Sequence, residues 1–210
     1  MAHRARNDDP DEVLMLRFQH GDVGAFEQIV SRQKTQLYSF ILHSVREKNI
    51  ADALLHDVFL AIAKRASEYK PEYKHEAHFL SWFYSIARDL CVASREGSQE
   101  DSQEDSQKRK SEDSDNAAGS DPARDDSVQP VAGVDPAALR RELKDLLDSV
   151  LAELPDDQRE VFLLREMVNL PFKEIAIITD APESFVKTRM RLALSRFRTV
   201  LQSHEEGASS

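Results

Sequence analysis

Hydrophobic residues recur every three or four positions along most of the chain, which is the spacing of an α-helix. In the first half, this pattern predicts helices over residues 10–20, 22–48, 50–67 and 76–95. In the second half, it predicts helices over residues 139–154 and 156–168, a short one after Pro171 and a last one after Pro182. The chain has only 6 Gly and 8 Pro, so turn signals are sparse. We therefore expect an all-α protein.

The helical pattern is interrupted between residues 96 and 136. This stretch contains twelve acidic and four basic side chains, no aromatic residue and a repeated SQED. It cannot bury enough apolar surface to offset the entropy of ordering it, so we expect a disordered acidic linker. The linker could be a plain solvated spacer, or an acidic strand that occupies a basic channel on a partner.

The linker divides the chain into two small helical domains. We predict a flexible tail at 1–9, an N-terminal block at 10–95, the linker at 96–136, a C-terminal block at 137–203 and a flexible tail at 204–210. The formal net charge of -10 belongs mostly to the linker, because the N-terminal block has eleven acids and eleven bases.

The cysteine content and the lack of long apolar segments indicate the compartment in which the protein is expected. Cys91 is the only cysteine, so no internal disulfide can form. The polar start MAHRARNDDPDE has no apolar signal segment, and no apolar run approaches the ~20 residues that cross a bilayer. We expect a soluble protein of a reducing, cytoplasmic compartment.

The end of the C-terminal block has the pattern of a helix-turn-helix, with a basic second helix. One apolar stripe is expected to face the preceding helices; it comprises Val186, Met190, Ala193, Phe197 and Leu201. Lys187, Arg191 and Arg198 lie off this stripe, with Ser184 and Thr188 among them. Cationic side chains bind phosphates, and Ser, Thr and Arg can reach base edges in the major groove. The helix either binds DNA or is a solvated face whose arginines pair with nearby acids.

The predicted helix at 76–95 is rich in aromatic residues. Phe79, Phe83, Ile86 and Leu90 make a core stripe along it. Tyr69, Tyr73 and Trp82 have two interpretations: they could stack on unpaired bases, or they could complete a small helical core.

Four stretches, taken in order, resemble a known family. They are GDVGAFEQIVSRQKTQLYSF at 21–40, ADALLHDVFLAIAKR at 51–65, FLSWFYSIARD at 79–89 and LPDDQREVFLLREMVNLPFKEIAIITDAPESFVKTRMRLA at 154–193. Together they resemble the conserved regions of bacterial RNA polymerase sigma factors of the extracytoplasmic-function (ECF) type, within the sigma-70 family. The resemblance implies that the N-terminal block is like sigma region 2 and that the C-terminal block is like the helix-turn-helix of region 4.

The same resemblance implies binding to core RNA polymerase, promoter recognition and transcription initiation. Contacts to the polymerase clamp helices would come from Asp57, Phe59 and Ile62. The melted minus-ten element would meet Tyr69, Lys70, Tyr73, Trp82 and Arg88. The minus-thirty-five element would meet Ser184, Lys187, Thr188, Arg191 and Arg198. The C-terminal block would also rest on the polymerase flap, the linker would pass the RNA exit region, and an anti-sigma factor is a common partner in the family.

Several positions depart from the family pattern. His56 replaces a Gln, Asp89 an Asn, Asp180 a Gly, Phe185 a Thr and Leu192 an Arg, and few basic residues follow Arg88. These departures keep open an alternative: a degenerate sigma-like protein that binds DNA or a partner and regulates without initiating transcription. The chain has no phosphate-binding loop and no Cys and His set with zinc spacing, so we expect no cofactor, no metal and no enzymatic activity.

Overall fold

The computed structural model describes residues 9–70, 77–104 and 136–208, and this part contains helices without any strand. The first group comprises α1 (Asp11–Gln19), α2 (Val23–Val45), α3 (Lys48–Arg65), a 3-10 turn η1 (Ala66–Glu68) and α4 (Ala77–Glu104). The second comprises α5 (Pro136–Glu153), α6 (Asp156–Phe162), a π-helical turn η3 (Leu163–Met167), α7 (Phe172–Ile178) and α8 (Glu183–Ala208). The prediction of an all-α protein is confirmed for the described residues.

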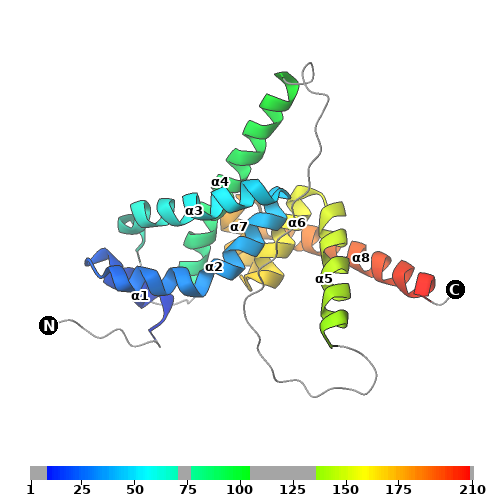
Figure 1. The fold of residues 1–210 in the computed structure, drawn as a ribbon, viewed down its shortest axis with the longest axis horizontal. Coiled ribbons are helices and arrows are strands. Elements are labelled where there is room, and N and C mark those ends of the chain that lie inside the picture. Colours follow the sequence, from blue (N-terminus) through cyan, green and yellow to red (C-terminus); the bar gives the residue numbers. More distant parts are fainter. Residues whose placement is uncertain (1–8, 71–76, 105–135, 209–210) are drawn as a thin grey trace.

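Two predicted boundaries fall inside helices. Helix α4 continues nine residues past the predicted end of the N-terminal block, and it projects beyond the body of the molecule (Figure 1). Helix α8 likewise continues through most of the predicted tail at 204–210. The remainder of the predicted linker, residues 105–135, lies outside the described residues, as does most of the predicted tail at 1–9.

The N-terminal block is held by a core at the predicted inward positions. These buried residues include Ile29, Leu37, Phe40 and Ile41 of α2, Val58 and Ile62 of α3, and Phe79, Phe83 and Ile86 of α4. The turn into α2 has Gly21 at φ +94, a conformation that side chains disfavour. Asp22 then caps α2, since its Oδ1 accepts a hydrogen bond from the Ala25 amide at 3.3 Å. Arg17 contacts the same carboxylate at 2.6 Å and thereby lowers the pKa of Asp22.

Prolines precede the last three helices of the C-terminal block. Pro155, Pro171 and Pro182 stand directly before α6, α7 and α8, where the missing amide proton breaks no helical hydrogen bond. Between α7 and α8, Asp180 has φ +47, in the left-handed region that the family pattern gives to a glycine. Asp adopts this conformation more readily than most residues other than glycine, so the turn stays tight.

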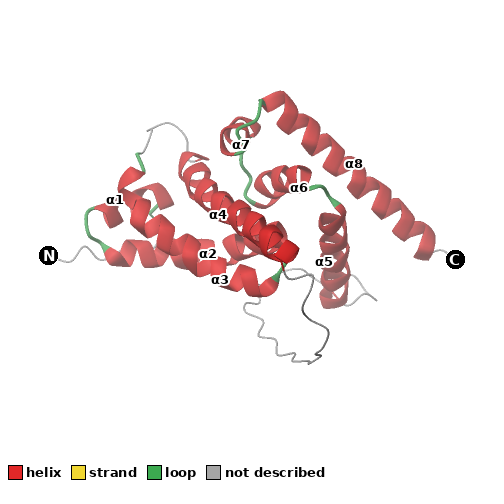
Figure 2. Cartoon of the chain, turned by 90° about the horizontal axis from the view of Figure 1, so that it is seen from above, coloured by secondary structure: helices red, strands yellow, loops and turns green. Residues whose placement is uncertain are grey.

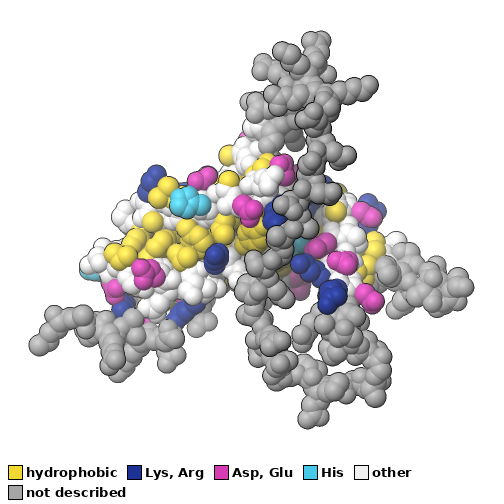
Figure 3. Space-filling model, viewed as in Figure 1, with side chains coloured by type: hydrophobic (Ala, Val, Ile, Leu, Met, Phe, Trp, Pro, Cys, Tyr) yellow, Lys and Arg dark blue, Asp and Glu magenta, His cyan; other side chains and the backbone are white. Residues whose placement is uncertain are grey.

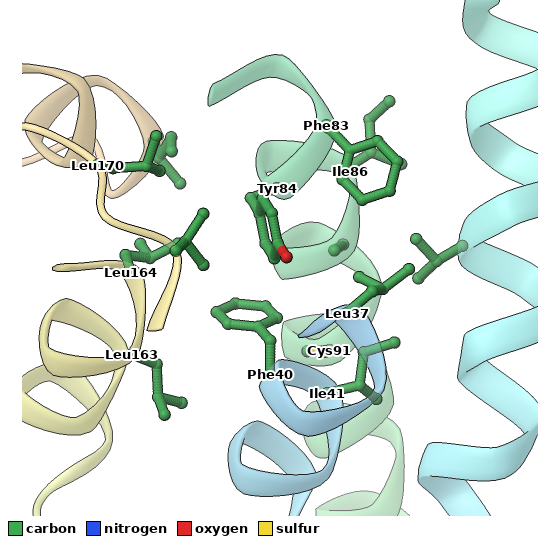
Figure 4. Close-up of a cluster of buried hydrophobic side chains, with 14 of the residues drawn as sticks. Leu37, Phe40, Ile41, Phe83, Tyr84, Ile86, Cys91, Leu163, Leu164 and Leu170 are labelled. Atoms are coloured by element: carbon green, nitrogen blue, oxygen red, sulfur yellow. The ribbon is translucent and has the colours of Figure 1, made fainter. Parts of the chain in front are cut away.

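The two blocks pack against each other in this structure. Phe40 of α2 and Tyr84 of α4 point toward Leu163, Leu164 and Leu170 of the C-terminal block (Figure 4). All five side chains are at most 1% exposed and belong to one continuous hydrophobic cluster.

Polar contacts reinforce this junction. The Ser81 hydroxyl donates to the Glu174 carboxylate at 2.7 Å, which joins α4 to α7. The Gln36 amide donates to the backbone carbonyl of Met167. The predicted boundaries at residues 95 and 137 thus divide the helices into two groups along the sequence. The hydrophobic core, however, contains side chains from both groups.

None of the described helices is both long and apolar enough to cross a bilayer.

Candidate nucleic-acid interface

Helix α8 is fixed to the C-terminal block along one side. Val186, Met190 and Ala193 are buried, and the Phe197 ring stacks on Phe162 of α6 with centroids 4.5 Å apart. The predicted apolar stripe is thereby confirmed as far as Phe197. With this side anchored, the opposite side of α8 lies at the outer edge of the molecule (Figure 2).

The five residues predicted to contact the minus-thirty-five element are all exposed on α8. Lys187 Nζ lies 2.6 Å from the Glu183 carboxylate, one turn earlier in the same helix. The Thr188 hydroxyl donates to the Ser184 carbonyl at 2.9 Å, and the Arg191 guanidinium donates to the Thr188 hydroxyl at 3.3 Å. An exposed ion pair within one helix contributes little to stability, so Lys187 can exchange Glu183 for a phosphate at small cost.

Arg189 has a structural role beside this face. Its guanidinium lies 2.9 Å from the Asp157 carboxylate and is only partly exposed. Since Asp157 lies in the first turn of α6, this ion pair joins α8 to the helix on which it rests. The pair adds a polar contact to the apolar packing that orients α8.

Sequence reasoning gave no role to the exposed apolar residues of α8. Phe185 is 61% exposed and Leu192 is 51% exposed. Both positions were noted only as departures from the family pattern. The sequence does contain one indication that these two side chains are exposed: neither position falls on the apolar stripe.

The residues predicted to meet the minus-ten element are placed differently from one another. Tyr69 is buried, with its ring 5.2 Å from that of Trp82 and 5.7 Å from that of Phe79. Burial raises the pKa of Tyr69 to about 12. Its ring lies in the core, as the core interpretation expects, so stacking on a base would require the ring to leave that core. Trp82 is partly buried, Lys70 is exposed, and Tyr73 lies outside the described residues.

Arg88 is engaged by the C-terminal block. Its Nε donates to the Glu160 carboxylate of α6 at 2.7 Å, and a second contact reaches the adjacent Asp89 at 3.7 Å. The Arg88 and Glu160 side chains are only 25% and 15% exposed. In this arrangement the predicted DNA-binding cation neutralises an acid of the other block.

The residues predicted to bind polymerase lie on three sides of α3. Asp57 is exposed, and Phe59 is partly buried, with its ring in edge-to-face contact with those of Phe26 and Phe83. Ile62 is fully buried, so its side chain supports α3 from the core and offers no surface to a partner. Leu60, which the sequence analysis did not select, is 43% exposed. Figure 3 shows hydrophobic side chains gathered in a strip along this part of the molecule.

Three arginines converge on Asp156 where the blocks meet. Arg46 and Arg95 each lie 3.3 Å from its carboxylate, and Arg159 lies 3.0 Å from it. Arg159 is 1% exposed and also donates to the Leu151 carbonyl at 2.8 Å, near the C-terminal end of α5. The three arginines and Asp156 line a cleft of about 210 Å³. Because the arginines come from α4, α6 and the end of α2, Asp156 joins the two blocks electrostatically.

In the described part of the chain, no three His, Cys, Asp or Glu side chains are grouped so that they could hold a metal ion.

Comparison with known proteins finds sigma factors, which are the family that the sequence motifs resemble. The family described as Sigma-70, region 4 matches residues 144–197, which include α6, α7 and most of α5 and α8. The ECF RNA polymerase sigma-E factor of Escherichia coli K12 is 26% identical over 86% of this chain and 88% of its own length. The RNA polymerase sigma-H factor of Pseudomonas aeruginosa is 23% identical over 92% of this chain and 95% of its own length.

Two solved structures share the fold. CnrH, solved in complex with the cytosolic domain of CnrY, has a TM-score of 0.62 and 19% identity, over 93% of this chain and 99% of that one. The sigma factor RpoE of Bartonella quintana, solved with the anti-sigma factor NepR, has a TM-score of 0.62 and 18% identity, over 84% and 96%. The family match lies on the helix-turn-helix, and both sigma-factor relatives align along nearly the whole chain. The chain therefore matches the sigma-70 region 4 family over residues 144–197, and it is similar along nearly its whole length to RNA polymerase sigma factors of the ECF type.

Proposed function

We propose that this protein binds core RNA polymerase and directs it to a small set of promoters, where α8 reads the upstream element. The observation that carries the proposal is the outer side of α8, which presents Lys187, Arg191 and Arg198 together with two hydroxyl groups. A helix fits the major groove of B-form DNA, which is about 12 Å wide. Phosphates then meet the cations, while Ser184, Thr188 and Arg191 reach base edges.

The N-terminal block supplies the contact with polymerase. On α3, exposed Asp57 and partly buried Phe59 remain the proposed docking residues, and exposed Leu60 joins them in place of Ile62. The C-terminal block rests on the polymerase flap. Since the protein contributes recognition and strand opening, the polymerase performs the chemistry, and the protein itself is not an enzyme. Its place of action is the cytoplasm, where polymerase and promoter meet.

Melting of the minus-ten element is assigned to the start of α4 and the segment before it. Lys70 and Trp82 keep accessible surface for the displaced strand. Arg88 becomes available to DNA when its ion pair with Glu160 opens, which requires α4 and α6 to separate locally. We therefore infer that promoter binding competes with the packing of the two blocks.

A partner that restrains the protein is also part of the proposal. RpoE of Bartonella quintana was solved with an anti-sigma factor, and it shares this fold. We infer that an anti-sigma factor binds this chain as well and keeps it from polymerase.

A second candidate is a sigma-like regulator that does not initiate transcription. Two observations favour it: Arg88 is held by Glu160, and Tyr69 is buried in the core. Both remove predicted minus-ten contacts from the surface in this arrangement.

Reconstituted transcription separates the two candidates. The protein is mixed with core polymerase and assayed for run-off transcripts on a library of genomic fragments. The proposed function predicts a stable core complex and new transcripts from a few fragments. It further predicts that Arg191→Ala reduces these transcripts without weakening core binding, whereas Lys34→Ala, an exposed cation on α2, leaves both unchanged. A stable complex without transcripts supports the regulator, and no complex at all contradicts both.

A further inference from the structure

Phe185 and Leu192 lie on the flank of α8 that is turned away from Lys187 and Arg191. Helical geometry gives 100° per residue, and buried Val186, Met190 and Ala193 mark the inner side. On that wheel Ser184, Thr188 and Ser195 fall opposite the core. One flank beside them carries Lys187, Arg191 and Arg198. The other flank carries Phe185 and Leu192, and Arg189 and Arg196 lie between these two residues and the core.

Phe185 stands in the first turn of α8 with most of its ring in water. It is 61% exposed, and a ring so placed forgoes the burial that it would gain in a core. Single exposed apolar residues are ordinary on protein surfaces. This one, however, lies in the part of a recognition helix that contacts base edges. The backbone there is fixed, because the amides of Phe185 and Val186 both donate to the Pro182 carbonyl, at 2.9 and 3.1 Å.

The chemistry of a phenyl ring selects one feature of the major groove. A ring cannot donate or accept a conventional hydrogen bond, so it cannot distinguish the polar edges of guanine, cytosine or adenine. Thymine alone presents an apolar group there, its C5-methyl, and phenylalanine is among the side chains that contact it. The cations on the opposite flank favour a polyanion such as duplex DNA over an apolar protein surface.

We propose that Phe185 recognises a thymine in the upstream promoter element through the C5-methyl group of that base. This inference rests on the proposed function and adds a specificity-determining residue to it. The element has a thymine under the apolar flank of α8, while the basic flank follows phosphates and polar base edges. Leu192, two turns further along the same flank, excludes water beside the duplex.

Replacing thymine by deoxyuridine tests the contact, because this change removes only the methyl group. Binding sites are first selected from a randomised duplex library with the protein bound to core polymerase. Each thymine of the selected upstream element is then replaced singly, and binding of the same complex is measured. At one thymine, the wild type should bind about fourfold more weakly after replacement, the effect of one buried methyl. Phe185→Ala should bind both duplexes equally at that position.

Arg191→Ala is the matched control on the opposite flank. It should weaken binding to both duplexes by the same factor and keep the preference for thymine. Circular dichroism of Phe185→Ala should match the wild type, since the side chain is largely exposed.

The outcomes separate this inference from the proposed function. Wild-type binding that is unchanged at every deoxyuridine overturns the thymine contact, whereas the selected element itself still supports promoter recognition. If no duplex is enriched at all, both fail. If Phe185→Ala loses core polymerase rather than thymine preference, the ring faces a protein partner, and the contact with DNA is also overturned.

Discussion

The ion pair between Arg88 and Glu160 should measurably hold the two blocks together. It joins α4 to α6 at 2.7 Å, with the two side chains 25% and 15% exposed. Exposed ion pairs contribute about 0–1 kcal/mol, whereas removing one partner of a buried pair costs about 3–5 kcal/mol. Since this pair is only partly shielded from water, we expect Glu160→Gln to lower the free energy of unfolding by about 1–2 kcal/mol.

A double-mutant cycle isolates the pair from the other effects of each substitution. The free energy of unfolding is measured by urea denaturation for the wild type, Glu160→Gln, Arg88→Gln and the double variant. We expect a coupling energy of about 1 kcal/mol, because each single variant loses the same contact. Glu166→Gln, an exposed acid on η3, is the control and should change the free energy of unfolding by less than about 0.5 kcal/mol.

The dependence of the coupling energy on ionic strength provides a second test of the same ion pair. Salt screens exposed charges more than buried ones, so a partly shielded pair should keep most of its coupling energy at 0.5 M salt. A coupling energy of zero, or an effect of Glu160→Gln no larger than that of the control, would refute the view that this pair joins the blocks.

Three further predictions follow from burial. Ile62→Ala should lower the free energy of unfolding by about 2–5 kcal/mol in urea titrations, because Ile62 is fully buried; an unchanged value would place it at the surface. Burial lowers the pKa of His43, which Asp148 opposes at 3.7 Å, so the unfolded chain takes up its proton first. Stability should therefore be complete above about pH 6.5 and fall as the pH drops below it. His43→Gln should flatten that part of the pH profile; an equally steep profile would count against the burial. Burial also raises the pKa of the Cys91 thiol to about 12, so a thiol reagent at pH 8 should modify it slowly in the native protein and rapidly in urea; equal rates would contradict this.

Local patterns in the sequence were sufficient for the helix-turn-helix. Val186, Met190 and Ala193 recur with the helical period, so the sequence shows which side of α8 is buried. The place of the turn was also visible in the sequence, because Asp180 stands where the family pattern has a glycine. Both features depend on neighbours within a few residues along the chain.

Contacts between distant segments could not be read in this way. Arg88 and Glu160 are 72 residues apart, and nothing in either local pattern pairs them. Periodicity likewise assigns Ile62 to a helix without showing which neighbouring helices cover it. The burial of Tyr69 depends on rings contributed by α4, so only the folded chain decides between the core and the base-stacking interpretation.

The position of α8 on promoter DNA is the central claim, and tethered cleavage measures it directly. Ser195 is exposed and lies opposite the buried stripe of α8, while Cys91 is 2% exposed. A reagent that generates hydroxyl radicals can therefore be attached selectively to Ser195→Cys in the free protein, which is then mixed with core polymerase. Cleavage of both strands around the major groove of the minus-thirty-five element is the predicted result. Cleavage elsewhere on the promoter, or none while the complex remains bound, would contradict the account.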